Sequence, residues 1–386
     1  MKKIISILGS TGSIGQQSLK IISKKKNIFQ IYLLSANKNL NEIKKQILKY
    51  KPKYFMISNY ETYKKIKKNH NNKKIKIINN LDNLRIKKKI DICISAIPGV
   101  TGLKPTISII KFSKKLLIAN KESIICGWRL IEIEAKRYKT KIIPIDSEHF
   151  SIFKLIQSHE ISEIKKIYLT ASGGPFLNFS KNQISKIKPK DALKHPKWEM
   201  GKKISIDSAT LMNKILEIVE AHKLFKIPYH KLDILIHPNS LVHAIVQFKN
   251  GLYSFIYHEN SMIIPIANAI FEKNFDIDIF YKSKMNKKFE NNLIFKPVSQ
   301  KVFPTIVFKR LINQNPSTPI IVNASNEVLV EQFLAKKIGF YDIFKFILNV
   351  LKDKNYRKYA IRKPTNINQI LTINNWAKKT TLEKIY

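Results

Sequence analysis

The sequence predicts an α/β protein with a doubly wound, mostly parallel sheet, followed by an α+β domain and a C-terminal helical bundle. Three observations support this fold class. Short apolar runs alternate with helical patterns over the first 146 residues, strands mix with helices in the middle of the chain, and helical periodicity dominates from residue 301 onward. A chain of 386 residues suits two or three domains, because domains typically contain about 100–200 residues.

The apolar runs of the first part each lead into a helical pattern, which is the order of βαβ units in a parallel sheet. The predicted strands of this part are residues 3–8, 29–36, 91–97, 115–119 and 141–145. The middle part adds predicted strands at residues 164–172, 233–238, 241–248 and 253–258. We expect domains at residues 1–146, 147–271 and 301–386, with residues 272–300 as a connecting segment because their periodicity is weak.

The formal net charge of +43 favours binding to polyanions in general. Lysine is spread along almost the whole chain, however, and the aromatic signatures of RNA-binding modules are missing. We therefore expect no specific nucleic-acid partner.

The cysteines and the hydropathy pattern indicate a compartment. Cys93 and Cys126 are too few for a disulfide framework and suit a reducing cytoplasm. The N-terminal apolar run is too short for a signal peptide, and no other stretch is long enough to span a bilayer. We expect a cytoplasmic protein without a membrane partner.

The stretch "ILGSTGSIG" (residues 7–15) follows a predicted strand and opens a predicted helix. Gly9, Gly12 and Gly15 would let backbone N–H groups and the helix N-terminus hold a pyrophosphate, as in Rossmann-like folds. A merely tight strand–helix turn is the alternative. After the second strand stands Lys38 and no acid. A cation suits the extra phosphate of NADP, whereas an acid would hold the ribose of NAD, so the sequence favours NADP.

Two further stretches follow predicted strands. In "IANKES" (residues 118–123), Asn120, Lys121 and Glu122 would lie at the carboxyl edge of the sheet, where ligands bind, although a plain turn is the alternative. In "IIPIDSEHFSIF" (residues 142–153), Asp146 and Glu148 would point to one side of an extended chain and repel each other unless a cation lies between them. A metal site and a helix N-terminus capped by Asp146 or Ser147 both explain this pair.

Hydroxyl, amide and charged groups concentrate in "TASGGPF" (residues 170–176) and "HPKWEMGKKISIDSATLMNK" (residues 195–214). Ser172 beside two glycines and Ser208 at a predicted helix start offer donors for a phosphate. Asn213, Lys214 and Glu217 fall at a helical spacing that can direct all three toward one site.

His195 and Trp198 lie in a predicted loop with the composition of a mobile lid. A surface histidine and a core tryptophan are the alternatives for these two residues taken singly.

Taken in order, "GSTGSIG", "ANKES", "PIDSEH", "SGGPF", "HPKWEMGKKISIDSATLMNK", "LIHPNSLVH" and "NASNEV" resemble the 1-deoxy-D-xylulose 5-phosphate reductoisomerase family over nearly the whole chain. The resemblance implies an NADPH- and divalent-metal-dependent enzyme, using Mg²⁺ or Mn²⁺ with Co²⁺ as a further candidate. Such an enzyme makes 2-C-methyl-D-erythritol 4-phosphate for isoprenoid synthesis. The resemblance also implies a homodimer.

The resemblance implies roles for individual residues, which we write as expectations. The metal ligands would be Asp146, Glu148 and Glu217. The substrate contacts would be Lys121, Ser147, Glu148, Ser172, His195, Ser208, Asn213, Lys214 and Glu217. The NADPH contacts would be Thr11, Gly12, Ser13, Ile14, Lys38, Asn39, Asn120, Glu122 and Gly201. Trp198 and Met200 would belong to a flexible flap. Catalysis would rest on Lys121, Asp146, Glu148, His195 and Glu217.

The chain departs from the family pattern at a few positions. Asn37 and Ile215 stand where glycine is expected, and "HENSMIIPI" (residues 258–266) lacks the usual Pro-Asp-Met-Arg run. None of these positions is an expected metal or phosphate ligand. The departures would therefore lower the level of activity without changing the type of reaction.

Two rival interpretations come from other classes of protein. An aspartate-semialdehyde-dehydrogenase-like enzyme opens with a similar glycine turn but needs a nucleophilic cysteine. Cys93 lies inside a predicted apolar strand, and Cys126 has no recognisable base nearby in the sequence. The other rival is a basic binding protein that has kept an old dehydrogenase scaffold. The retained acidic residues and phosphate donors argue against it, because drift would remove buried carboxylates that had no metal to bind.

Overall fold

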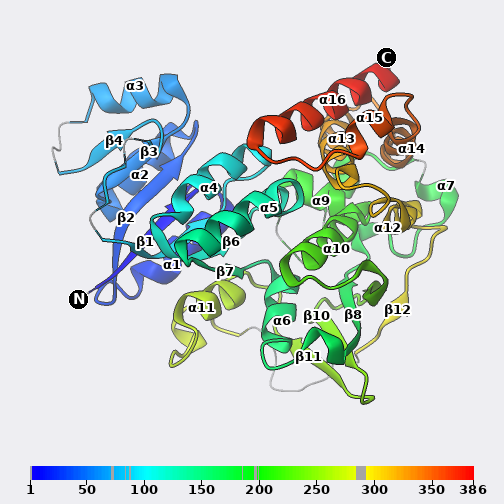
Figure 1. Cartoon of the computed structure of the whole chain (residues 1–386), viewed down its shortest axis with the longest axis horizontal. Coiled ribbons are helices and arrows are strands. Elements are labelled where there is room, and N and C mark those ends of the chain that lie inside the picture. Colours follow the sequence, from blue (N-terminus) through cyan, green and yellow to red (C-terminus); the bar gives the residue numbers. More distant parts are fainter. Residues whose placement is uncertain are drawn as a thin grey trace. The chain divides into compact units, whose positions relative to one another are not determined.

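The computed structural model of the chain describes residues 2–70, 74–82, 84–86, 88–184, 186–194, 198, 200–283 and 293–386. The chain forms two compact units. Unit 1 comprises Met1–Ser123, Arg129–Phe150 and Ser261–Lys284, and unit 2 comprises Ile124–Trp128, Ser151–Asn260 and Met285–Tyr386. Figure 1 labels the helices and strands along the chain.

Unit 1 is built on a seven-stranded sheet in the order β4-β3-β2-β1-β5-β6-β7, and every neighbouring pair is parallel. The strands are β1 (Lys3–Leu8), β2 (Phe29–Ala36), β3 (Tyr54–Ile57), β4 (Lys76–Ile78), β5 (Ile90–Ser95), β6 (Ser113–Ile118) and β7 (Lys141–Pro144). The chain winds outward from β1 first through β2 and later through β5. This order confirms the predicted doubly wound, Rossmann-like sheet and places the switch point of the winding at β1 and β5.

The helices of unit 1 connect these parallel strands, as crossovers in such a sheet must. They are α1 (Ser13–Ser23), α2 (Leu40–Tyr50), α3 (Tyr60–Lys68), α4 (Leu103–Ile110) and α5 (Lys121–Tyr138), except that Ile124–Trp128 of α5 are assigned to unit 2. The beginning of α6 (Ser147–Leu155) also belongs to unit 1. An asparagine side chain accepts a backbone N–H at the start of α2, α3 and α5. These caps fix where each helix begins relative to the preceding strand.

Residues 261–284 belong to unit 1 although they follow the middle part of the chain. Their helix α11 (Ile263–Phe271) packs against α1, and the ring of Phe271 meets that of Phe29 edge-on at 5.5 Å. The Glu272 carboxylate forms an ion pair of 2.7 Å with the Lys115 ammonium on β6. Aromatic and ionic contacts therefore attach this late segment to β2 and β6 of the parallel sheet.

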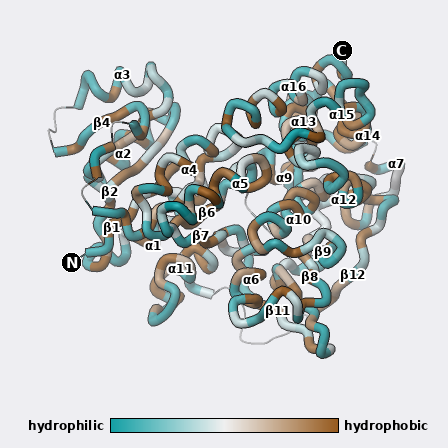
Figure 2. The backbone as a smooth tube through the Cα atoms, viewed as in Figure 1, coloured by the Kyte–Doolittle hydropathy of each residue, from teal (hydrophilic) through white to brown (hydrophobic). Residues whose placement is uncertain are grey.

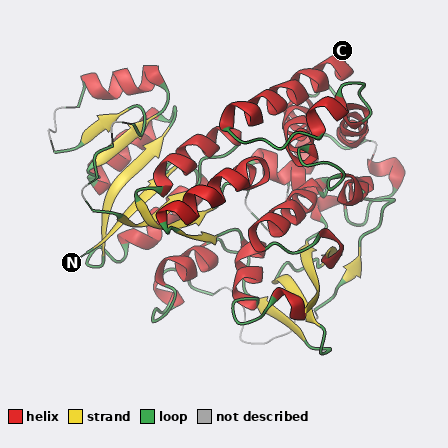
Figure 3. Cartoon of the chain, viewed as in Figure 1, coloured by secondary structure: helices red, strands yellow, loops and turns green. Residues whose placement is uncertain are grey.

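Unit 2 contains a five-stranded mixed sheet in the order β11-β10-β8-β9-β12. Its strands are β8 (Ile164–Ala171), β9 (Leu232–Ile236), β10 (Val242–Phe248), β11 (Tyr253–Tyr257) and β12 (Lys296–Pro297). Only β8 and β9 pair in parallel among these described strands. Figure 3 shows these strands with helices beside them, as expected for an α+β unit.

The helices of unit 2 include α7 (Lys181–Ile184), α8 (Pro189–Ala192), α9 (Lys202–Ala209), α10 (Met212–Phe225), α12 (Phe308–Leu311), α13 (Thr318–Leu334), α14 (Phe340–Leu351), α15 (Tyr356–Ala360) and α16 (Ile367–Ile385). Helix α13 packs against α14, α16 and α9. From Thr318 to Asn326 every side chain of α13 is buried, whereas α16 alternates hydrophobic and hydrophilic residues (Figure 2). The predicted C-terminal helical bundle is thus present, with α13 as its central helix.

None of the helices within the described part of the chain is both long and apolar enough to cross a membrane.

The turn between β1 and α1 allows a test of the packing. A Cβ added to Gly15 would meet the Cα of Ser10 at 2.6 Å, whereas a Cβ added to Gly12 would come no closer than 3.5 Å to the Gly9 carbonyl oxygen. We predict that Gly15→Ala lowers the free energy of unfolding by about 1–3 kcal/mol because overpacking forces the backbone to shift. Gly12→Ala should lower it by less than Gly15→Ala does, because the added Cβ has room and only the N-cap preference for glycine over alanine is lost. Urea unfolding followed by circular dichroism measures both, and equal stabilities would contradict the prediction.

Candidate active site

The turn after β1 presents backbone N–H groups at the carboxyl edge of the unit 1 sheet. Gly9 has a φ of +84°, and a Cβ there would meet the Ala96 carbonyl oxygen at 2.6 Å, so the turn requires glycine. Gly12 is the N-cap of α1 and offers no side chain to its first turn. The N–H groups in the first turn of any helix lack an intrahelical acceptor, and Gly12 provides no side-chain acceptor for them. This turn therefore favours an anion. Thr11, Gly12, Ser13 and Ile14, the residues expected to contact the dinucleotide, are exposed or half-buried in this turn.

The end of β2 carries the residues expected at the ribose phosphate. Asn37, Lys38 and Asn39 are all exposed. The Asn39 side chain accepts the backbone N–H of Glu42 at 3.1 Å and so begins α2. Helix capping by Asn39 leaves the Lys38 ammonium as the charged group directly after this strand.

The end of β6 holds Asn120 and Glu122 against the loop that follows β5. Asn120 is almost fully buried, and its side-chain amide donates to the carbonyl oxygens of Ile97 and Gly99. The Glu122 carboxylate accepts the backbone N–H of Gly99 at 3.3 Å. Two neighbouring strand ends are thereby tied together beside the glycine turn.

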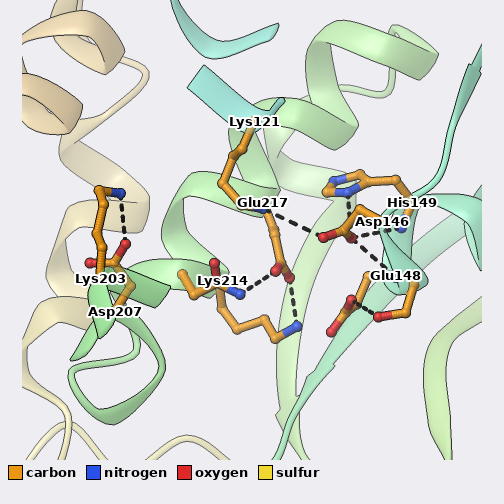
Figure 4. Close-up of polar contacts among 10 residues, drawn as sticks. Lys121, Asp146, Glu148, His149, Lys203, Asp207, Lys214 and Glu217 are labelled. Atoms are coloured by element: carbon orange, nitrogen blue, oxygen red, sulfur yellow. Dashed lines mark hydrogen bonds and ion pairs between the residues drawn. The ribbon is translucent and has the colours of Figure 1, made fainter. Parts of the chain in front are cut away.

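Asp146 connects β7 to α6 and makes contacts with both of its carboxylate oxygens. Oδ1 accepts the backbone N–H groups of Glu148 at 3.2 Å and His149 at 3.4 Å, and it lies 3.0 Å from the imidazole Nδ1 of His149. Oδ2 lies 3.9 Å from the Lys121 ammonium (Figure 4). The helix-cap interpretation is therefore correct for Oδ1, while Oδ2 faces a cation.

The extended geometry that we predicted for Asp146 and Glu148 is wrong. Glu148 lies in the first turn of α6, so the rule that residues two apart share a side of a strand does not apply. The Glu148 carboxylate accepts the Ser147 hydroxyl at 2.6 Å instead. Because Asp146 caps α6, the helix begins at Ser147, and Glu148 is already part of it.

In unit 2, the first turns of α10 bring three predicted residues together. The Glu217 carboxylate is fully buried and accepts the Lys214 ammonium at 2.6 Å (Figure 4). It also accepts the Asn213 side-chain amide. The spacings of three and four residues make these contacts possible within one helix. A buried carboxylate needs such partners, since removing charge from water without compensation is costly.

The loop after β8 lies against the end of α9. The Ser172 hydroxyl accepts the backbone N–H of Gly174 at 3.0 Å, and both Gly173 and Gly174 have positive φ values, +82° and +60°. A Cβ added to Gly174 would meet the Ser208 carbonyl oxygen at 3.3 Å. Ser172 and Ser208 thus belong to adjacent backbone segments of unit 2, although they are 36 positions apart in the sequence.

The helix start that we predicted at Ser208 is wrong. Ser208 lies in the last turn of α9, and the next helix begins only after Leu211. Leu211 adopts a left-handed conformation with a φ of 64°, which ends one helix and allows α10 to start in a new direction. Sequence patterns give little warning of this break, because glycine or asparagine usually occupies such a position.

The expected flap is described only in part. His195 lies outside the described residues. Trp198 and Met200 are half-buried, and the Trp198 ring meets that of His243 edge-on at 6.0 Å between ring centroids. Gly201 is the exposed N-cap of α9, and a Cβ there would meet nothing within 4 Å.

Comparison with known proteins gives the chain a family. Residues 5–127 match the family model "1-deoxy-D-xylulose 5-phosphate reductoisomerase", and residues 142–225 match that of its C-terminal domain. Residues 259–380 match "DXP reductoisomerase C-terminal domain". The reductoisomerase of Pelagibacter ubique (strain HTCC1062) is 45% identical over 97% of this chain and 97% of its own length. The chain belongs to the 1-deoxy-D-xylulose 5-phosphate reductoisomerase family.

Other members of the family agree in sequence and in fold. The reductoisomerase of Wolbachia sp. subsp. Drosophila simulans (strain wRi) is 40% identical over 91% of this chain and 90% of its own length. A reductoisomerase from Zymomonas mobilis, solved with NADPH, superposes with a TM-score of 0.89 at 30% identity, covering 100% of this chain and 99% of that one. A DOX-P reductoisomerase solved with NADPH, fosmidomycin and magnesium gives 0.90 at 31% identity, covering 99% and 98% of the two chains.

Family membership removes the aspartate-semialdehyde-dehydrogenase-like alternative. The structure agrees with this result, because Cys93 lies fully buried inside β5. Burial raises the pKa of the Cys93 thiol to about 12. A thiol that keeps its proton in this way cannot act as the nucleophile that such an enzyme needs.

The departures from the reductoisomerase pattern are accommodated locally. Ile215 is fully buried in α10, which continues through it from Met212 to Phe225. The Asn37 side chain accepts the Ser58 hydroxyl at 3.2 Å, which attaches the end of β2 to the residue after β3.

His149 is a residue to which sequence reasoning assigned no role. Its side chain is fully buried and lies on Asp146, a predicted metal ligand. The spacing of three residues between Asp146 and His149 at a helix start was the available signal. Such a neighbour orients a carboxylate without binding the metal itself.

The two roles of Asp146 can be separated by substitution. Asp146→Asn should keep the cap of α6, because asparagine caps helices as well as aspartate does. Asp146→Ala removes the cap and should lower the free energy of unfolding by about 1 kcal/mol relative to Asp146→Asn. Urea unfolding of the two variants tests this difference. If Asp146→Ala is as stable as Asp146→Asn, the cap contributes nothing.

Proposed function

We propose that this chain catalyses the NADPH- and divalent-metal-dependent rearrangement and reduction of 1-deoxy-D-xylulose 5-phosphate to 2-C-methyl-D-erythritol 4-phosphate, a step toward isoprenoid precursors in the non-mevalonate pathway. The observation that carries this proposal is the similarity to curated reductoisomerases along nearly the entire length of both chains. The direct test is NADPH oxidation by the purified protein with 1-deoxy-D-xylulose 5-phosphate, with and without Mg²⁺ or Mn²⁺.

The proposed metal ligands are Asp146, Glu148 and Glu217, each of which can offer one carboxylate oxygen. A set of oxygen ligands fits Mg²⁺ or Mn²⁺, with Co²⁺ as a further candidate, and disfavours zinc. Asp146 and Glu148 belong to unit 1 and Glu217 to unit 2, so the proposal requires both units for one site. When bound, the divalent cation would polarise the carbonyl group of the substrate.

For NADPH we propose the carboxyl edge of the unit 1 sheet. The glycine turn would hold the pyrophosphate, and the Lys38 ammonium would pair with the 2′-phosphate. The proposed contacts are Thr11, Gly12, Ser13, Ile14, Lys38, Asn39, Asn120, Glu122 and, from unit 2, Gly201. The support lies in the position of the unit 1 residues among them, which follow β1, β2 and β6 at the edge where ligands bind in such sheets.

For the substrate phosphate we propose Ser172, Ser208, Asn213 and Lys214, with His195 closing over it. Hydroxyl, amide and ammonium groups are the donors that a phosphate needs. Lys121, Ser147, Glu148 and Glu217 would contact the remainder of the substrate. Holding the phosphate end orients the carbon chain, so that one carbon–carbon bond breaks and another forms before NADPH reduces the resulting aldehyde. Trp198 and Met200 would cover the site and exclude water.

We also infer domain roles, compartment and assembly. Residues 1–146 would bind NADPH, residues 147–271 would carry catalysis with the flap, residues 272–300 would connect, and residues 301–386 would support the site as a helical domain. The protein would act in the cytoplasm as a homodimer. Its dispersed lysines support only weak, salt-dependent binding to nucleic acids.

The choice of cofactor gives one prediction. Lys38→Glu should reduce the preference for NADPH over NADH, because a carboxylate repels the 2′-phosphate that the ammonium attracts. Lys44→Glu, an exposed lysine on α2, is the matched control and should leave the preference unchanged. The measurement is kcat/KM for both cofactors. Equal efficiency of the unmodified enzyme with NADPH and NADH would refute this assignment.

The metal gives another prediction. Glu217→Gln should lower metal-dependent turnover by about a hundredfold or more while leaving NADPH binding intact, since one charged ligand is lost. Glu163→Gln changes an exposed carboxylate and should have no effect. Turnover is measured across a Mg²⁺ titration, and NADPH binding by calorimetry. Full activity of the native enzyme in EDTA would show that no metal is needed.

A further inference from the structure

The motif "NASNEV" lies in α13 and has no role in the site described above. Asn323, Ser325 and Asn326 of this motif are all fully buried. Burying a side-chain amide is costly unless it forms hydrogen bonds. The position of these groups in the central helix of the bundle therefore calls for a reason.

Asn326 makes a long-range contact with α9. Its side-chain Nδ2 donates to Oδ1 of Asp207 at 2.7 Å, across 119 residues of sequence. A carboxylate can only accept, so the donating face of the amide must point toward Asp207. The other oxygen of Asp207 accepts the Lys203 ammonium at 2.8 Å (Figure 4). Asp207 is almost fully buried, so the Lys203 ammonium compensates its charge while the Asn326 amide provides a hydrogen bond to its other oxygen.

Asp207 directly precedes Ser208, at the junction between α9 and α10. The Thr210 carbonyl of this junction accepts the Thr305 hydroxyl, so a second long-range hydrogen bond holds it. Ser208 lies on one side of the left-handed residue Leu211, and Asn213 and Lys214 follow on the other side. A shift of Asp207 would therefore move Ser208 relative to the helix that carries the other phosphate donors.

We propose that Asn326 is a positioning residue for the phosphate end of the substrate. It holds Asp207, and through Asp207 it sets where the Ser208 hydroxyl lies relative to Asn213 and Lys214. This inference rests on the proposed function, because it takes Ser208 as a phosphate ligand. A leucine at position 326 would have nearly the same shape but no donor, leaving one oxygen of Asp207 buried without its partner.

The structure provides a matched control on the same helix. Asn323 is as buried as Asn326, and neither end of its amide has a hydrogen-bond partner among the described residues. Asn323→Leu should therefore keep activity and stability, because replacing an unsatisfied buried amide by an apolar group removes a cost. The comparison separates a general effect of changing α13 from a specific effect through Asp207.

The experiment measures steady-state kinetics of the full-length enzyme and inhibition by inorganic phosphate. Asn326→Leu should raise KM for 1-deoxy-D-xylulose 5-phosphate and the inhibition constant of inorganic phosphate together, by about 10- to 100-fold, because a small misplacement of a positioning group weakens binding. KM for NADPH should stay within about twofold, since NADPH relies mainly on unit 1. The double variant Asn326→Asp with Asp207→Asn exchanges donor and acceptor. It should restore part of the affinity for 1-deoxy-D-xylulose 5-phosphate and for inorganic phosphate that Asn326→Leu loses.

The outcomes distinguish this inference from the proposed function. If the unmodified enzyme does not turn over 1-deoxy-D-xylulose 5-phosphate, the proposed function fails and the inference falls with it. If the enzyme is active and Asn326→Leu leaves both phosphate-dependent constants unchanged, only the inference fails. The inference would also be overturned if Asn326→Leu and Asn323→Leu raised KM for 1-deoxy-D-xylulose 5-phosphate and KM for NADPH to the same extent. If Asn326→Leu does not fold, the two single variants Asn326→Ser and Asn323→Ser are compared in the same way.

Discussion

The parallel pairing of the strands in unit 1 is the constraint on which its candidate site depends. Because all these strands run in one direction, the residues that follow them meet at one edge of the sheet. Most of these strands are also followed by a helix, and that helix begins at the same edge. Asn39, Asn120 and Asp146 combine both features, since each follows a strand and caps the next helix. In the proposed function, helix capping and ligand binding would therefore draw on the same residues.

Unit 2 depends on a different device, the left-handed turn at Leu211. A non-glycine residue in this conformation costs about 1–2 kcal/mol. Leu211 is almost fully buried, and burying a leucine side chain contributes about 1.5–3 kcal/mol, which offsets that cost. Because of this turn, Ser208 lies on α9 and Asn213 lies on α10, although they are only five positions apart in the sequence. The hydrogen bonds that Thr305 and Asn326 make to this junction then hold the two helices in one arrangement.

Much of unit 1 could be predicted from the sequence, because buried parallel strands are apolar along their whole length. The strands β1 and β2 have the predicted bounds, Lys3–Leu8 and Phe29–Ala36. The short strand β3 (Tyr54–Ile57) was missed, since four residues show no periodicity of their own. The break at Leu211 and the contact of Asn326 with Asp207 could not be predicted either. The first uses an unusual residue for its backbone conformation, and the second depends on packing between distant segments rather than on local pattern.

The chain carries 70 lysine and arginine residues against 27 aspartate and glutamate residues, yet its candidate site depends on individual pairs rather than on this excess. Asp146 lies near Lys121, Asp207 pairs with Lys203, and Glu217 pairs with Lys214, each within its own unit. In the proposed function, a divalent cation on Glu217 would compensate the charge that Lys214 compensates now. The Lys214 ammonium would then be available to the substrate phosphate, so that one lysine stabilises a buried carboxylate in the free enzyme and an anionic substrate in the complex. Without the metal, the Glu217 carboxylate and the substrate phosphate would compete for the Lys214 ammonium. Binding of the metal to Glu217 would end this competition, so metal binding and phosphate binding would favour each other.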